Sequence, residues 1–295
     1  MTRDCIIERM SYEIRDLDKS RWPKGLSEIP QPPKKLRIAG QDPDLSSTFL
    51  AVVGARKCTP YGEAALRKIF SGLAEQNITI VSGLALGIDT IAHTLALEYK
   101  LKTIAFPGSG LDPHCLYPKT NRLLAEKILQ AGGTLLAEYP DNQQAAPWTF
   151  PQRNRLMAGL SQAVLVVEAL RPSGTLITSK LALDYNKEVL AIPGSILSTP
   201  SDGPNWLISR GATPVTTSDT LLEALNLLRP QNLSLDLSDL SGNEQMVLEI
   251  LTVPADKDTL IASLPLSDRD IDITLSTLEI KGLIKIEAGY ICRQI

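Results

Sequence analysis

Short apolar runs alternate with helix-type patterns along most of the chain. Runs such as FLAVV, from Phe49, and ITIV, from Ile78, are apolar at nearly every position and end at glycine or serine. Between the runs, apolar residues recur at the spacing of an amphipathic helix. Strands without alternation are typical of a parallel sheet that helices cover on both faces. The pattern predicts strands at 49–53, 78–82, 102–106, 133–137, 163–168, 188–192 and 213–216, and helices at 61–76, 88–99, 119–130, 153–160, 174–186, 203–210 and 218–227.

The beginning of the chain lacks this regularity. Four prolines between positions 23 and 33 interrupt any long helix. One strand is expected at Lys34–Ala39, and residues 1–20 form either a short helix or a loose segment. We therefore predict an N-terminal extension at 1–48, partly packed on a core domain at 49–228.

The last quarter of the chain has a different pattern. Residues 229–242 hold many turn-forming residues and predict a linker. Residues 243–295 contain three helical segments followed by an alternating segment, which is typical of a winged-helix domain. Such domains often place the third helix in a DNA groove. Here that stretch, 268–281, carries four carboxylates and two basic residues. It would repel phosphate, so we expect this domain to contact protein.

Composition excludes several classes of protein. Apolar residues make up 43% of the chain and charged residues 21%, as in ordinary globular proteins. No apolar run is long enough for a membrane span, and the N-terminus is charged throughout, without the core of a signal peptide. The four cysteines are far apart and form no C-x-x-C. This predicts reduced thiols in a cytoplasmic protein, and neither a disulfide framework nor a metal site.

The net charge of −3 is unevenly distributed. Ser241–Ile295 holds nine acidic and five basic residues, whereas residues 1–240 hold 24 acidic and 25 basic ones. A site for a polyanion must therefore be a local patch in the first 240 residues.

Two strand–turn–helix units follow one another at 49–93. The first strand ends at the turn GARKCTPYG and the second at SGLALG. Ligands of parallel sheets bind at the carboxyl ends of strands, where glycine turns lead into helix N-termini. Free N–H groups and the helix dipole favour an anion there, and an arginine adds a fixed positive fork. The sequence predicts a phosphate-binding edge formed by Gly54, Arg56, Ser82, Gly83 and Gly87.

A second stretch, FPQRNR, places an aromatic residue beside arginines. Phe150, Arg153 and Asn154 are expected at the N-terminus of a helix, where arginine is unfavourable unless an anion compensates it. An aromatic face for a base and a guanidinium for a phosphate suit single-stranded nucleic acid. The alternative is structural: Arg153 pairs with Glu168 or Asp89, and Phe150 belongs to the core. Both interpretations fit the sequence.

Two further turns follow strands and can hold an anion. One is SGT, which opens a helix, and the other is the proline-stiffened loop FPGSGLDPHCLYPKTN. For the second, a rigid loop without a ligand is an equally good interpretation. The candidate residues in these turns are Ser173, Gly174 and Thr175, and Gly108, Gly110 and Lys119.

The sequence provides no convincing catalytic group. Neither G-x-G-x-x-G nor a Walker lysine motif is present, so a role as turn formers fits the glycines equally well. His93 lies within a predicted helix and is expected to be a buried structural residue, and His114 has no further metal ligands at useful spacing. We therefore expect no catalytic residues, no metal and no cofactor.

Together the motifs resemble those of the DprA/Smf DNA-processing family. The segments VGARKCTPYG, VSGLALGIDTIAH, GSGLDPHCLYPKTN, FPQRNRLMAGLSQAVLVVEA, SGTLIT and AIPG occur in the family's order, from about Trp22 to Val215. The resemblance implies an extended Rossmann-like α/β domain with a C-terminal winged helix, and the absence of the N-terminal helical domain of some members. It implies a homodimer that binds single-stranded DNA, protects incoming DNA in natural transformation, helps load the RecA recombinase and needs no nucleotide.

The resemblance also assigns residues. Arg56 is similar to the family's pocket arginine, and Phe150, Arg153 and Asn154 occupy its F-x-x-R-N positions. The remaining matches are to the two glycine turns, Gly83 and Gly87 in one, and Ser173, Gly174 and Thr175 in the other.

Two enzymes are the alternatives. Nucleotide-cleaving phosphoribohydrolases of related fold carry P-G-G-x-G-T-x-x-E, and here Thr178 stands where their catalytic glutamate should be. A nicotinamide-dependent oxidoreductase would be favoured by fold class alone, which is weak evidence of function.

Overall fold

The computed structural model describes residues 12–228, 240–251, 255–281, 283–287 and 290–293. The chain divides into two compact units, Met1–Leu228 and Arg229–Ile295. Most of residues 1–20 and of the predicted linker lie outside the described residues.

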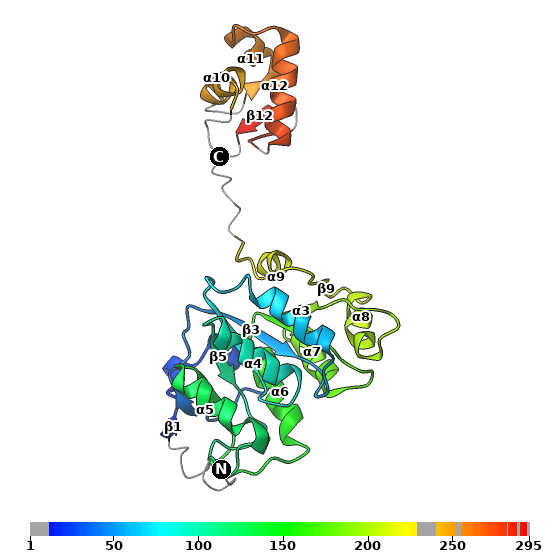
Figure 1. The fold of residues 1–295 in the computed structure, drawn as a ribbon. Helices are drawn as coiled ribbons and strands as arrows, with labels where there is room; N and C mark the ends of the chain where they lie inside the picture. Colours follow the sequence, from blue (N-terminus) through cyan, green and yellow to red (C-terminus); the bar gives the residue numbers. More distant parts are fainter. Residues whose placement is uncertain (1–11, 229–239, 252–254, 282, 288–289, 294–295) are drawn as a thin grey trace. The chain divides into compact units, whose positions relative to one another are not determined.

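A nine-stranded sheet forms the centre of the larger unit, with the order β1-β2-β6-β5-β4-β3-β7-β8-β9 in the described part of the chain (Figure 1). Neighbouring strands from β6 to β9 pair in parallel, as predicted. The strands are β1 Ile14–Asp16, β2 Arg37–Gly40, β3 Thr48–Val53, β4 Ile78–Ser82, β5 Lys102–Ala105, β6 Thr134–Ala137, β7 Ala163–Val166, β8 Glu188–Ala191 and β9 Thr213–Pro214.

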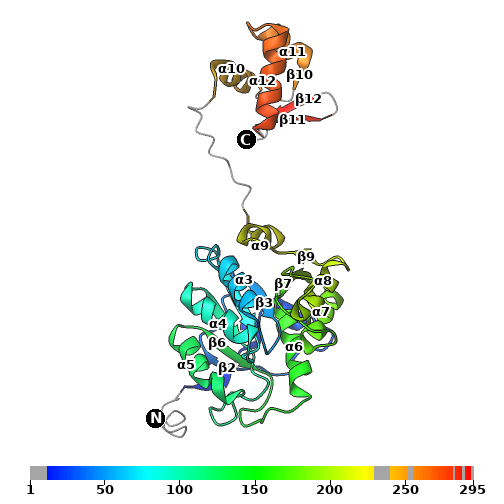
Figure 2. The same ribbon diagram turned by 45° about the vertical axis from the view of Figure 1, so that its right-hand side comes forward.

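Helices cover both faces of this sheet, which explains why its strands are apolar throughout. Leu50 and Val52 of β3 pack in the same cluster as residues of α3, α4 and α9, whereas Ala51 and Val53 pack with residues of α2, α6, α7 and α8. In Figure 2, α3 and α4 lie on one side of β3, and α6 and α7 on the other. The helices are α2 Lys24–Glu28, α3 Pro60–Phe70, α4 Ile88–Glu98, α5 Arg122–Gln130, α6 Thr149–Leu160, α7 Gly174–Asp184, α8 Asp202–Ile208 and α9 Ser218–Ala224, with 3₁₀ turns at Lys19–Arg21, Lys119–Asn121 and Thr199–Ser201.

Most helix starts agree with the sequence, but α6 does not. Thr59 caps α3 by accepting a hydrogen bond from the Gly62 N–H. The predicted helix at 153–160 begins at Thr149, so Pro151 lies in its first turn, where proline is tolerated. Arg153 consequently lies in the second turn of α6 and not at its N-terminus.

The segment before Phe49 contributes to the sheet and to the core. The predicted strand near Lys34–Ala39 is β2, which pairs antiparallel with β6 and with the short strand β1. Leu26 and Leu36 are fully buried. Trp22 is buried as well, and its indole N–H donates to the Leu17 carbonyl.

The smaller unit contains three helices and a three-stranded antiparallel sheet of order β10-β12-β11 among its described residues. Val247, Leu260 and Leu278 are buried at its centre. Its winged-helix class remains a prediction. The elements are α10 Gly242–Ile250, β10 Ala255–Asp256, α11 Lys257–Ser263, α12 Asp268–Ile280, β11 Ile284–Glu287 and β12 Tyr290–Arg293.

None of the helices in the described ranges combines the length and the apolar character needed to cross a bilayer.

Candidate functional site

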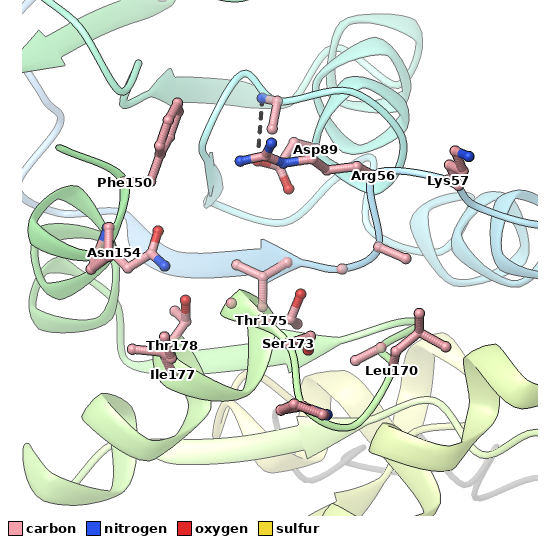
Figure 3. A pocket seen from close by; sticks show the side chains of 18 of the residues that line it. Arg56, Lys57, Asp89, Phe150, Asn154, Leu170, Ser173, Thr175, Ile177 and Thr178 are labelled. Atoms are coloured by element: carbon pink, nitrogen blue, oxygen red, sulfur yellow. Dashed lines mark hydrogen bonds between the residues drawn. The ribbon is translucent and has the colours of Figure 1, made fainter. Parts of the chain in front are cut away.

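A pocket of about 620 Å³ lies beyond the carboxyl ends of β3 and β7 (Figure 3). Within the sheet, β3 has β4 as its neighbour along one edge and β7 along the other, so the strand order reverses at β3. Such a reversal of strand order is the usual place for a ligand in an open α/β sheet. The loops after β3 and β7 and the N-terminal turns of α6 and α7 line the pocket. Eight predicted site residues meet there: Gly54, Arg56, Phe150, Arg153, Asn154, Ser173, Gly174 and Thr175.

A cation and an aromatic ring form the open rim of this pocket, and a second ring outside the pocket lining packs against the first. The guanidinium of the exposed Arg56 lies 5.1 Å from the centre of the Phe150 ring. Tyr117 packs against the same ring with its centroid 5.9 Å away and is 43% exposed. Lys57, next to Arg56, is exposed and also lines the pocket. The rim therefore offers positive charge and aromatic surface together.

Tyr117 and Lys57 were not among the site residues predicted from the sequence. Lys57 directly follows Arg56, so a basic pair in a glycine turn was the available signal. Tyr117 lies in the proline-stiffened loop, and a small cavity of about 30 Å³ joins it to Arg56, Gly83 and Phe150.

Arg153 is buried in the pocket wall. Its Nη1 donates to the carbonyl oxygens of Gly83, at 2.5 Å, and Phe106, and its Nε donates to Asn154 Oδ1 at 3.2 Å. Burial lowers the pKa of Arg153, and the nearby Asp89 opposes this shift. Two backbone carbonyls thus hold Nη1 of the guanidinium, whereas the described residues show no ion pair of Arg153 with Glu168 or Asp89, the partners named in the structural alternative. Its predicted partner Glu168 instead accepts hydrogen bonds from the backbone and hydroxyl of Thr59.

The turn after β4 is organised by its own carboxylate. Asp89, in the first turn of α4, accepts from the N–H groups of Gly83, at 3.1 Å, and Ala85, at 3.3 Å. Burial raises the pKa of this carboxyl, while Arg153 acts in the opposite direction. Asp89 thereby occupies the Gly83 N–H, one of the groups predicted to hold a phosphate.

Ser82 and Gly87 have structural roles in the same turn. The Ser82 hydroxyl is buried and donates to the Val52 carbonyl at 2.6 Å. Gly87 has φ +76°, and a Cβ there would lie 2.3 Å from the Ala55 carbonyl oxygen. Neither residue lines the pocket.

The proline-stiffened loop packs against the Phe150 ring of the rim. A Cβ at Gly108 would lie 2.5 Å from the Phe150 ring, so this glycine allows the ring to pack closely. Gly110 is confined in the same way by the carbonyls of Pro140 and Asp141. Lys119 is exposed in the 3₁₀ turn and lies outside the pocket lining.

The turn before α7 faces the pocket across from the rim. In Figure 3, Ser173 and Thr175 lie on the opposite side of the cavity from Arg56 and Phe150. Ser173 precedes the helix but makes no capping hydrogen bond, and its buried Oγ has no partner in the described part of the chain. The first N–H groups of α7 therefore lack the side-chain partner that a serine at this position usually supplies.

Titratable groups suited to catalysis do not gather in the pocket. Asp89 is the one carboxylate among the lining residues and is engaged by backbone N–H groups. His93 is fully buried beside Thr103, and burial lowers its pKa to about 3. The described residues contain no group of three or more histidine, cysteine or acidic side chains placed to hold a metal.

The fold and the pocket define an extended Rossmann-like α/β protein with a cationic, aromatic site at the point where its strand order reverses. The family model of DNA recombination-mediator protein A matches residues 13–226, and the chain belongs to this family. The α/β fold class of the larger unit and the resemblance are both confirmed, while the winged-helix part of the predicted fold stays a prediction.

Three relatives illustrate the similarity. The Smf protein of Escherichia coli is 40% identical over 221 residues, 75% of this chain and 59% of its own length. DNA processing protein DprA of Streptococcus pneumoniae is 44% identical over 201 residues, 68% of this chain and 70% of its own. Its X-ray structure superposes with a TM-score of 0.66 at 40% identity, covering 72% of this chain and 74% of that one.

The third relative is DNA processing protein A of Helicobacter pylori, whose structure concerns a single-stranded DNA binding mode of that protein. It superposes with a TM-score of 0.64 at 30% identity and covers 73% of this chain and 96% of that one. The present chain spans less than two thirds of the E. coli relative.

Proposed function

We propose that this chain is a single-stranded DNA-binding recombination mediator. The observation that carries the proposal is the exposed Arg56 guanidinium stacked 5.1 Å from the Phe150 ring at the mouth of an open pocket. Unpaired nucleic acid offers phosphates for the cation and base faces for the ring, whereas the bases of a duplex are already stacked. The site therefore suits a single strand better than a double one.

The cellular role follows from the family. In natural transformation, the protein protects incoming DNA in the cytoplasm and helps load the RecA recombinase, acting as a homodimer. The single-stranded DNA binding mode of the H. pylori relative supports the DNA-binding part of this role.

DNA is bound without being cut. A phosphoribohydrolase would need a carboxylate at Thr178, and the single carboxylate lining the pocket, Asp89, is occupied by the N–H groups of Gly83 and Ala85. No observation favours an oxidoreductase.

A binding titration tests the proposal. The wild type should bind single-stranded oligonucleotides more tightly than duplexes of the same length, with a steep loss of affinity as salt rises. Arg56→Ala should weaken single-strand binding about tenfold and reduce the slope of log K against log salt by about 0.7, the value for one phosphate contact.

Arg67→Ala is the matched control. Arg67 is also exposed, but it lies on α3, pairs with Glu98 and does not line the pocket. Its removal changes the net charge equally and should leave the affinity unchanged. Equal effects of the two substitutions would mean that strand affinity depends on the total charge of the protein and not on the pocket. Equal affinity of the wild type for single and double strands would overturn the proposal.

A further inference from the structure

The side of the pocket formed by α7, the turn before it and part of α6 differs chemically from the rim. We call it the α7 side, and it consists of Asn154, Met157, Leu170, Ser173, Gly174 and Ile177. It carries no charged side chain, whereas the rim carries Arg56 and Lys57. An anion there must be held by backbone and neutral polar groups.

The N-terminus of α7 provides such groups. This helix has 11 residues, and its first N–H groups have no partner within the helix. The Ser173 side chain caps none of them, its carbonyl accepts from the Leu176 N–H, and its own buried Oγ makes no hydrogen bond within the described residues. A hydroxyl without a partner beside uncapped N–H groups is costly unless a ligand or solvent completes the arrangement.

Gly174 supplies an independent observation. At Gly54, Gly83 and Gly108, a Cβ would come within 2.5 Å of a neighbouring side chain, so packing explains each glycine. At Gly174, an added Cβ would meet nothing within 4 Å, and its φ is not positive. The fold itself therefore leaves Gly174 unexplained, and the space beside it is open to an approaching ligand.

Asn154 points into the same space. Only 9% of the residue is exposed, and its Oδ1 accepts from Arg153 Nε. Its Nδ2 makes no hydrogen bond in the described part of the chain. Figure 3 shows the amide directed from α6 into the cavity, near Thr178. A nine-tenths buried donor aimed into a pocket is suited to a ligand oxygen.

The remaining surface of the α7 side is apolar. Leu170 and Ile177 are 49% and 44% exposed, and Met157 and Pro172 extend the same lining. An apolar wall beside an anion site fits a molecule with a flat base and a phosphate. The pocket volume of about 620 Å³ is that of a small-ligand site.

We propose that the α7 side binds one nucleotide unit with a terminal phosphate, its phosphate on the N–H groups of Gly174 and Thr175 and its base against Ile177 and Leu170. A phosphate monoester carries more charge than an internal diester and gains more from a helix N-terminus. The unit is the 5′-phosphorylated end of a strand or a free nucleoside monophosphate. The first of these sources rests on the DNA-binding function proposed above.

The decisive variant is Gly174→Ala. Its methyl group fits the fold without a clash but fills the space through which phosphate oxygens approach. Gly242→Ala is the matched control, because Gly242 is also the first residue of a helix and also has nothing within 4 Å of an added Cβ. Melting temperatures of both variants should equal or exceed that of the wild type, since alanine is the better helix former.

Four probes are titrated: thymidine oligonucleotides labelled at the 3′ end, with a 5′-phosphate or a 5′-hydroxyl, and free dTMP or thymidine. Wild type and Gly242→Ala should prefer the 5′-phosphorylated strand about tenfold, the effect of one charge-assisted hydrogen bond. Gly174→Ala should lose the preference, so that it binds the 5′-phosphate and 5′-hydroxyl strands with equal affinity. Asn154→Asp, which keeps the acceptor for Arg153 but replaces the amide donor by a negative charge, should reduce the preference as well.

The outcomes separate the two sources and the two proposals. A preference for dTMP over thymidine that Gly174→Ala abolishes, without any preference among strands, supports the inference with the free nucleotide as ligand. Equal binding of both strands together with no binding of dTMP overturns it, as does a preference that survives Gly174→Ala. If neither strand binds, the proposed DNA-binding function fails, and the dTMP titration alone decides the inference.

Discussion

Replacing Arg153 by alanine should destabilise the larger unit, and a loss of DNA binding should follow from that loss of stability. Arg153 is only 5% exposed, and its guanidinium donates to the carbonyls of Gly83 and Phe106. The substitution leaves both carbonyls buried without a partner and removes the positive charge near the buried Asp89.

The size of the effect follows from these contacts. Each buried unsatisfied carbonyl costs about 1–3 kcal/mol, so the free energy of unfolding should fall by about 2–6 kcal/mol. In a unit of this size, 1 kcal/mol corresponds to about 2–4 °C, which gives a fall in melting temperature of roughly 5–20 °C.

Calorimetry on the wild type, Arg153→Ala and Arg56→Ala measures the difference. Arg56 is exposed and should affect strand affinity with little change in melting temperature. Strand binding is then compared at a temperature where all three proteins are folded. An Arg153→Ala variant that melts like the wild type but no longer binds DNA would refute the reasoning, because Arg153 would then have to contact the strand itself.

Three further substitutions or truncations test other parts of the structure. Phe150→Leu keeps an apolar side chain but removes the aromatic face, so single-strand affinity measured by fluorescence anisotropy should fall by about 1–3 kcal/mol; unchanged affinity would exclude stacking on this ring. Burial lowers the pKa of His93 to about 3, against 6.5 when unfolded, so the unfolded state alone takes up a proton between these values and stability falls as the pH is lowered from 6.5 towards 3. His93→Gln should therefore lose less melting temperature than the wild type between pH 7 and 5, and an equal loss would contradict this assignment. A fragment ending at Leu228 lacks the acidic smaller unit and should bind single strands within about threefold of the full chain at equal salt; a large loss would place part of the site beyond Leu228.

The sequence predicts the sheet well because each strand can be recognised from its own run of apolar residues. Runs such as Phe49–Val53 are apolar at every position, and both faces of β3 are in fact buried. The predicted start of α6 at position 153 is four residues late, since the helix begins at Thr149 and Pro151 lies in its first turn, where proline is tolerated. The short strand β1, with only three residues, carries too little pattern to be recognised.

The site was predictable in position but not in the role of each residue. Glycine turns after strands indicated the correct edge of the sheet, and Arg56 and Phe150 do meet there. The role of Arg153 depends on carbonyls 70 and 47 residues away in the sequence, at Gly83 and Phe106. Local pattern contains no information about such partners, so a binding role and a structural role remained equally compatible with the motif.

The antiparallel pairing of β2 with β6 has a practical consequence for anyone who shortens this protein. Residues from Arg37 to Gly40 cover the outer edge of β6 along its whole length, from Ala137 to Thr134. An expression clone started at Phe49, where the regular pattern begins, would leave that edge bare and ready to recruit a strand from another molecule. Such a clone should yield aggregates, and a useful minimal fragment has to include β2.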